Sequence, residues 1–139
     1  MKPTVHFGIF LTAALLAIPA YGQHMNEKDS PCANVVVTAE LTKCLSDARD
    51  RADVKLNFVY KQIRSRLEGA DAASLTKTQG LWIQYRDANC SAERDLYEGG
   101  TAKYAVYFAC LESLTRGRTR ELQVTTTVRL NFRAVDLTH

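Results

Sequence analysis

Four cysteines constrain the fold of this chain more than any other feature of its sequence. They stand at Cys32, Cys44, Cys90 and Cys110, so successive cysteines are 12, 46 and 20 residues apart. These spacings include no close C-x-x-C pair of the kind that structural zinc sites use, which disfavours a metal site. The remaining interpretation is a pair of disulfide bonds, which requires an oxidising compartment.

The first 22 residues provide a route to such a compartment. Lys2 gives a positive start, an apolar run covers residues 7–18, and the small residues Ala20 and Gly22 follow. This layout is typical of a cleavable signal peptide, and the apolar run is shorter than the roughly 20 residues of a membrane-spanning helix. We therefore expect residues 1–22 to be removed and the mature protein to be periplasmic or secreted. No cysteine near Gln23 could carry a lipid, so we expect no membrane anchor after cleavage.

The mature chain is close to neutral. The full sequence has 18 Lys and Arg and 15 Asp and Glu, and losing Lys2 leaves 17 minus 15, a charge of +2. Acidic and basic residues are interspersed along residues 43–55. This pattern is that of a solvated helix face with i,i+4 pairs, and it argues against a nucleic-acid partner.

Hydrophobic periodicity predicts an all-α fold, a small antiparallel bundle of three main helices. Residues 23–31 are polar and suit a flexible leader, and residues 32–122 form the helical domain. The first helix starts near Thr38, which can cap it, and Gly69 ends it. The second helix is capped by Asp71 or Ser74 and runs to about Tyr97, and the third follows the Gly99-Gly100 turn, from Thr101 to about Leu122.

The C-terminal segment, residues 123–139, has a different composition. Val and Thr are frequent in it and alternate in part with polar residues, which favours extended structure. A single strand would have no partner in an otherwise helical chain. We therefore expect an irregular, loosely packed tail.

The expected helices also indicate which cysteines pair. Cys32 lies just before the first helix and Cys44 lies two turns into it, whereas Cys90 and Cys110 flank the Gly99-Gly100 turn at similar distances. Four cysteines allow three connectivities. We predict Cys32 with Cys44 and Cys90 with Cys110.

Polar residues at helical spacing predict a network between the first two helices. If the turn near Gly69 makes these helices antiparallel, residues whose numbers sum to about 140 face each other. Asp53 then meets Arg86, which can hold its carboxylate with two donors, and Tyr60 meets Gln79. The predicted structural network comprises Asp53, Asn57, Tyr60, Gln79, Trp82 and Arg86.

The sequence offers no recognisable catalytic, cofactor-binding or metal-binding residues. The mature chain has only His24 and His139, both near its ends and outside the predicted network. No serine or cysteine has a base at a recognisable spacing, and no glycine-rich phosphate loop is present. An uncharacterised hydrolase is therefore the least favoured function.

Several of these motifs together resemble the LprI-type lysozyme inhibitor family. They are the four placed cysteines, the Ala52-Asp53 to Leu56-Asn57 to Tyr60 series, Gln79, the string Trp82-x-x-Tyr85-Arg86-Asp87-x-x-Cys90, Tyr97 with Gly99-Gly100, and Cys110 followed by Thr115 and Leu122. The similarity extends over roughly residues 32–122. It implies an exported, disulfide-linked helical domain, and the activity that names the family is inhibition of lysozyme.

The resemblance suggests a binding module whose partner is a lysozyme or another peptidoglycan hydrolase. The module would inhibit this enzyme by occluding it, without chemistry of its own. Acidic residues on an inhibitor favour its association with a basic enzyme, and several acidic residues lie around the Gly99-Gly100 turn. The candidate partner-binding residues are Glu93, Asp95, Tyr97, Glu98, Gly99 and Gly100. The alternative is a structural or envelope-stress protein without a hydrolase partner. The sequence leaves the oligomeric state open.

Overall fold

The computed structural model describes residues 24–136, together with the side chains up to residue 125 except that of Asn26. The predicted signal peptide lies outside this range. A short 3-10 helix, η1 (His24–Asn26), precedes three long helices, α1 (Thr38–Arg64), α2 (Gly69–Asp95) and α3 (Lys103–Asp136). The described part of the chain contains no strand, so the predicted all-α fold of three main helices is confirmed.

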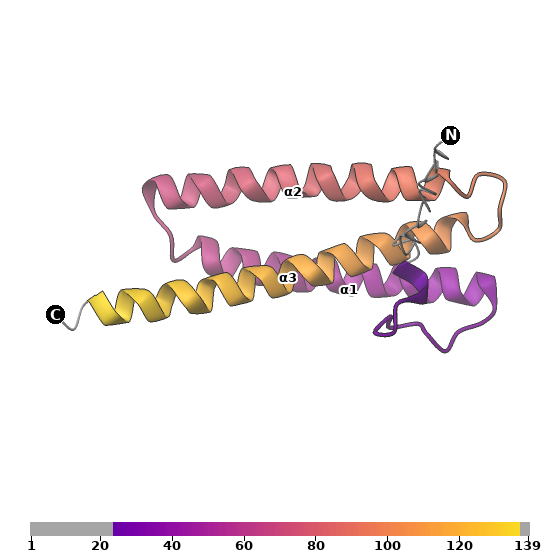
Figure 1. The fold of residues 1–139 in the computed structure, drawn as a ribbon, viewed down its shortest axis with the longest axis horizontal. Helices are drawn as coiled ribbons and strands as arrows, with labels where there is room; N and C mark the ends of the chain where they lie inside the picture. Colours follow the sequence, from indigo (N-terminus) through magenta and orange to yellow (C-terminus); the bar gives the residue numbers. More distant parts are fainter. Residues whose placement is uncertain (1–23, 137–139) are drawn as a thin grey trace, which may run out of the picture.

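The third helix is the centre of the bundle. The chain runs up, down and up again, so that α1 and α3 are parallel and α2 is antiparallel to both (Figure 1). α1 packs mainly on α3, α2 packs less extensively on α3, and α1 and α2 contact each other very little. The sequence analysis expected the main polar seam between α1 and α2, but the structure places α3 between them in the packing.

Small residues explain the close contact of α1 with α3. Near the start of both helices, Leu45 and Ala48 pack with Ala105 and Ala109, and all four are at most 4% exposed. Alanines at these positions let the two backbones approach, and full burial of a leucine such as Leu45 contributes about 1.5–3 kcal/mol. Towards the other end, a second buried cluster continues the same interface. It comprises Leu56, Val59 and Leu122, with Trp82 and Leu75 of α2 packed against it.

Both disulfides join the cysteines predicted to pair. Cys32 is bonded to Cys44 with Cα atoms 6.1 Å apart, and Cys90 to Cys110 with Cα atoms 5.5 Å apart. The first holds the segment before α1 onto that helix. The second links α2 to α3. The turn between these two helices is at the right of Figure 1.

The helix ends differ from the predicted caps. Val37 precedes α1 and its side chain makes no capping hydrogen bond, so Thr38 is the first helical residue instead of the cap. α1 already ends at Arg64, and Gly69, with φ +51°, opens α2 after Glu68. The positive φ explains the glycine, since it is a conformation that residues with a Cβ rarely adopt.

The predicted irregular tail is wrong for most of its length. α3 continues through Gly117 and through the Val and Thr residues to Asp136, and it extends past the α1–α2 turn (Figure 1). A β-branched residue disfavours helix by only about 0.7 kcal/mol at most, whereas extending an existing helix needs no new nucleus. Residues 137–139 lie outside the described range.

The leader, expected to be flexible over residues 23–31, is held against the bundle from His24 onwards. Met25 packs on the cluster around Leu45. Glu27 and Asp29 both pair with the guanidinium of Arg116 on α3. None of the described helices is long and apolar enough to cross a membrane.

Candidate functional site

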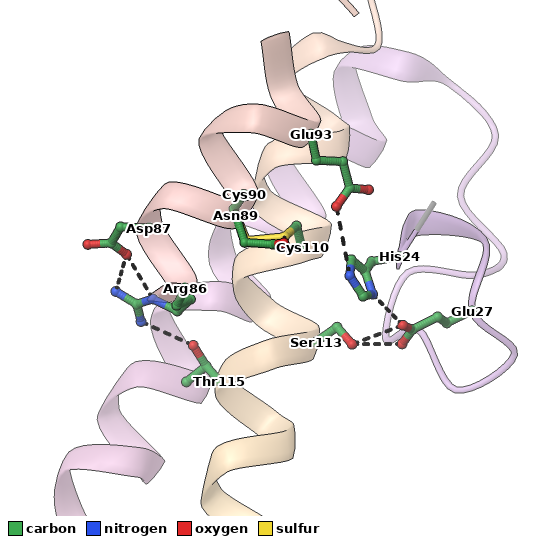
Figure 2. The surroundings of a disulfide bond; sticks show 10 residues. All are labelled: His24, Glu27, Arg86, Asp87, Asn89, Cys90, Glu93, Cys110, Ser113 and Thr115. Atoms are coloured by element: carbon green, nitrogen blue, oxygen red, sulfur yellow. Dashed lines mark hydrogen bonds and ion pairs between the residues drawn. A yellow bond between two sulfur atoms is a disulfide. The ribbon is translucent and has the colours of Figure 1, made fainter. Parts of the chain in front are cut away.

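Polar clusters lie on both sides of the Cys90–Cys110 disulfide, and Figure 2 shows them together. On one side, Arg86 of α2 donates from Nη1 to Asp53 Oδ1 of α1 at 2.9 Å and to Thr115 Oγ1 of α3 at 3.1 Å. Thr115 is fully buried and Arg86 is 14% exposed. This three-helix network, Asp53, Arg86 and Thr115, therefore joins all three helices at one guanidinium.

The predicted contact of Asp53 with Arg86 is present, but in a different form. One donor of Arg86 reaches Asp53, and its Nε and Nη2 both lie 2.9 Å from Oδ1 of the neighbouring Asp87. The two-donor grip expected on Asp53 is made on Asp87 instead, and the Nη1 donor that reaches Asp53 is shared with Thr115 of α3. The sequence analysis assigned the network to α1 and α2 alone and therefore did not include Thr115 of α3.

The other predicted members of the network are distributed over separate contacts. Tyr60 donates to Thr76 at 3.2 Å, whereas buried Gln79 accepts from Arg118 of α3 at 3.1 Å. The structure therefore does not pair Tyr60 with Gln79. The guanidiniums of Arg86 and Arg118 both lie over the ring of Trp82, at 5.3 and 5.9 Å from its centroid. Asn57 is exposed.

On the other side of the disulfide, His24 faces two carboxylates. Its Nδ1 bonds to Glu27, and its Nε2 lies 3.8 Å from Oε2 of Glu93 on α2 (Figure 2). Ser113 of α3 donates to both oxygens of Glu27, at 3.0 and 2.9 Å. We refer to His24, Glu27, Glu93 and Ser113 as the N-terminal cluster.

The pKa values of the two glutamates of the N-terminal cluster are shifted in opposite directions. Burial raises the pKa of Glu93 above its ordinary value, against the opposing effect of nearby His24. Its Oε1 is buried and receives no hydrogen bond from the described residues. Partial burial acts to raise the pKa of Glu27 as well, but hydrogen bonds from His24 and Ser113 outweigh it and lower that pKa.

The chemistry of the N-terminal cluster is not that of an activated nucleophile. In a serine hydrolase the imidazole receives the serine proton, and a carboxylate orients the imidazole from its far side. Here Glu27 lies between Ser113 and His24, and both ring nitrogens of His24 face carboxylates. His24 therefore cannot act as the base for Ser113 in this arrangement.

A metal site is also poorly supported by these residues. His24, Glu93 and Cys110 offer ligand atoms within 4.8 Å of one another. The Cys110 sulfur is, however, already bonded to Cys90 and is no thiolate. The two groups that remain are fewer than the three or four protein ligands usual for zinc.

The candidate partner-binding residues fall into two places. Glu93 is buried on the inner face of α2, toward His24, which removes it from the predicted surface. The others lie at or beyond the end of α2, where residues 96–102 form the α2–α3 turn at one end of the molecule (Figure 1). Asp95, Glu98, Gly99 and Gly100 are exposed and Tyr97 is half-buried.

The α2–α3 turn carries an apolar residue that the sequence analysis did not select. Leu96 is 84% exposed at its start. Asp95 pairs with Arg94 at 2.8 Å, and Glu98 lies 3.8 Å from the ammonium of Lys103. The predicted acidic group is thus balanced by adjacent cations, and Gly99, with φ +77°, sets the course of the turn.

Comparison with known proteins gives one family and one relative. The model of the family described as lysozyme inhibitor LprI matches residues 30–122. An uncharacterised protein of Rhizobium meliloti (strain 1021) is 27% identical, over 70% of this chain and 79% of its own length. No solved structure matches the chain.

Proposed function

This chain belongs to the lysozyme inhibitor LprI family, and we propose that it is an exported binding module that inhibits a lysozyme or another peptidoglycan hydrolase by occlusion. The family match carries this proposal. The two disulfides fit an oxidising location outside the cytoplasm, which we propose is the periplasm or the exterior. Occlusion requires no catalytic group in the inhibitor.

We propose the α2–α3 turn as the surface that enters the enzyme. It lies at one end of the bundle, where a convex element can reach into a substrate cleft (Figure 1). The Cys90–Cys110 disulfide and the buried Ala105 and Val106 fix the helices at its base. A turn that is rigid before binding loses less conformational entropy in the complex, which favours affinity.

Apolar contact is better supported than charge as the source of affinity. Leu96 exposes most of its side chain, whereas Asp95 and Glu98 lie beside cations of the same surface. With a mature charge of about +2, long-range attraction to a basic enzyme is weak, and we expect inhibition to depend little on salt.

The experiment is titration of the oxidised mature chain into cell-wall lysis assays with lysozymes of several types and with bacterial hydrolases. We expect stoichiometric inhibition of at least one enzyme. Replacement of Leu96 by Asp should weaken that inhibition at least about tenfold, the effect of losing roughly 1.4 kcal/mol. Phe58→Asp is the matched control, because Phe58 is a 60% exposed apolar residue on α1.

Each result has a definite meaning. Inhibition that Leu96→Asp and Phe58→Asp leave equally intact would keep the function but reject the turn as its surface. A folded protein that inhibits none of the enzymes would reject the proposal and favour a structural or envelope-stress role.

A further inference from the structure

The outer face of α2 carries a row of exposed apolar residues that no part of the described bundle covers. They occur at steps of four, three, four and four residues, which places them on one side of the helix. The α2 stripe comprises Leu81, Tyr85, Ala88, Ala92 and Leu96. Leu81, Tyr85 and Leu96 are 54%, 57% and 84% exposed, and both alanines are exposed.

The stripe is distinct from the residues that α2 uses within the bundle. Gln79, Cys90 and Glu93 are buried on its opposite side. Isolated exposed apolar residues are normal on a soluble protein, but a continuous row along a helix indicates an interaction surface. Figure 1 shows α2 at the edge of the bundle.

We propose that the α2 stripe binds the α2 stripe of a second copy of this chain, with the two helices antiparallel. In a two-fold antiparallel pair, residues whose numbers add to a constant face each other. A constant of 173 places Tyr85 against Ala88 of the second copy and Leu81 against Ala92. Every large side chain in the centre then meets a small one, which lets the helices approach closely.

Charge supports the same register. Lys77 and Asp95, both exposed, lie on one edge of the stripe toward opposite ends, and their numbers add to 172. The antiparallel pair therefore brings Lys77 of each copy near Asp95 of the other, where Asp95 also accepts a hydrogen bond from its neighbour Arg94. Leu96 would lie beside the aliphatic stem of Lys77, which can cover apolar surface while its ammonium stays in water.

A parallel pair would be poorly matched. It would set Tyr85 against Tyr85 and Leu81 against Leu81, and it would leave Lys77 of each copy far from Asp95 of the other. The stripe is thus complementary to itself in one direction only, which points to a second copy of this chain.

The interface is small, so the dimer should be weak and reversible. From Lys77 to Leu96 the paired surface is about 29 Å long, at 1.5 Å per residue. One helix pair of this length buries less than the roughly 1,200 Å² at the lower limit of standard interfaces. This inference does not depend on the proposed inhibitor function, but the dimer would cover Leu96, so a dimer and an enzyme complex would compete for that residue.

The test is sedimentation equilibrium of the oxidised mature chain over a wide concentration range. We expect a reversible monomer–dimer equilibrium in which Tyr85→Glu increases the dissociation constant at least about tenfold. Phe58→Glu, at a similarly exposed position on α1, should leave it unchanged. Circular dichroism of each variant verifies that the bundle is folded.

A charge-exchange experiment tests the register. Lys77→Glu and Asp95→Lys should each weaken the dimer several-fold, and the double variant should recover most of the loss, since it restores opposite charges across the two-fold axis. A monomer at all concentrations would overturn the proposal. A dimer that Tyr85→Glu leaves intact, or that Phe58→Glu disrupts equally, would overturn it as well.

Discussion

Replacement of Arg86 by alanine is the most informative test of how the bundle is held together. The substitution removes one donor shared by Asp53 and Thr115, at 2.9 and 3.1 Å, and the guanidinium above the Trp82 ring. Thr115 is inaccessible to water, so its hydroxyl would retain only the 3.4 Å contact with Asp53. Asp53 would lose its cation while 31% exposed.

The expected cost follows from these exposures. Breaking a buried ion pair by removing one partner costs about 3–5 kcal/mol. Because about a third of the Asp53 side chain still contacts water, we expect about 2–3 kcal/mol for Arg86→Ala. For a domain of this size, 1 kcal/mol corresponds to about 3–5 °C, so the melting temperature should fall by about 6–15 °C.

The assay is thermal unfolding followed by circular dichroism, with Asp87→Ala as the matched control. Asp87 pairs with the same guanidinium but is 53% exposed, so its loss should cost less than about 0.5 kcal/mol. Arg86→Lys keeps the charge without the planar fork and should lie between the two. A fall below about 2 °C for Arg86→Ala, or one equal to that of Asp87→Ala, would refute the reasoning.

Two further predictions concern buried charge and backbone conformation. Burial raises the pKa of Glu93 above 4.5, so the folded state binds the proton of this carboxyl more tightly than the unfolded chain does. The stability that this proton contributes is present below pH 4.5 and is lost as the pH rises through the pKa of the folded state. Glu93→Gln should therefore raise the melting temperature at neutral pH and change it much less below pH 4.5; an equal change at both would contradict this account. Gly99→Ala should destabilise the fold by about 1–2 kcal/mol because of the positive φ, whereas Gly117→Ala within α3, where a Cβ meets nothing within 4 Å, should stabilise it by about 0.5–1 kcal/mol. Chemical denaturation compares the two alanine variants, and the same sign for both would show that the backbone argument fails.

The features that depend on local spacing could be predicted from the sequence. The three helices, the disulfide partners and the contact of Asp53 with Arg86 all follow from residues at helical intervals around two short turns. Periodicity defines each single helix, and the position of a turn defines which residues of two consecutive helices face each other.

The features that depend on packing between distant segments could not be predicted from the sequence. Pairing two helices across a short turn does not indicate that α1 packs on α3 more than on α2. This preference comes from alanines such as Ala105 and Ala109, which allow the backbones of α1 and α3 to approach closely. Likewise, Arg116 forms ion pairs with Glu27 and Asp29, which lie nearly 90 residues earlier in the chain, and these pairs hold the leader against α3. The burial of Glu93 has the same origin, since His24 lies opposite it only in the folded protein.

The central position of α3 has a consequence for folding under the proposed export. If the chain crosses a membrane from its N-terminus, as proposed, α1 and α2 arrive first and have little surface to pack on each other. The bundle can close only after residues 103–122 have crossed, because non-local contacts must await the later segment. The Cys32–Cys44 bond, within one early segment, can form in transit, but the Cys90–Cys110 bond must wait for α3. In that proposed order of export, α3 arrives after α1 and α2, so the two earlier helices lack their main packing surface until it has crossed.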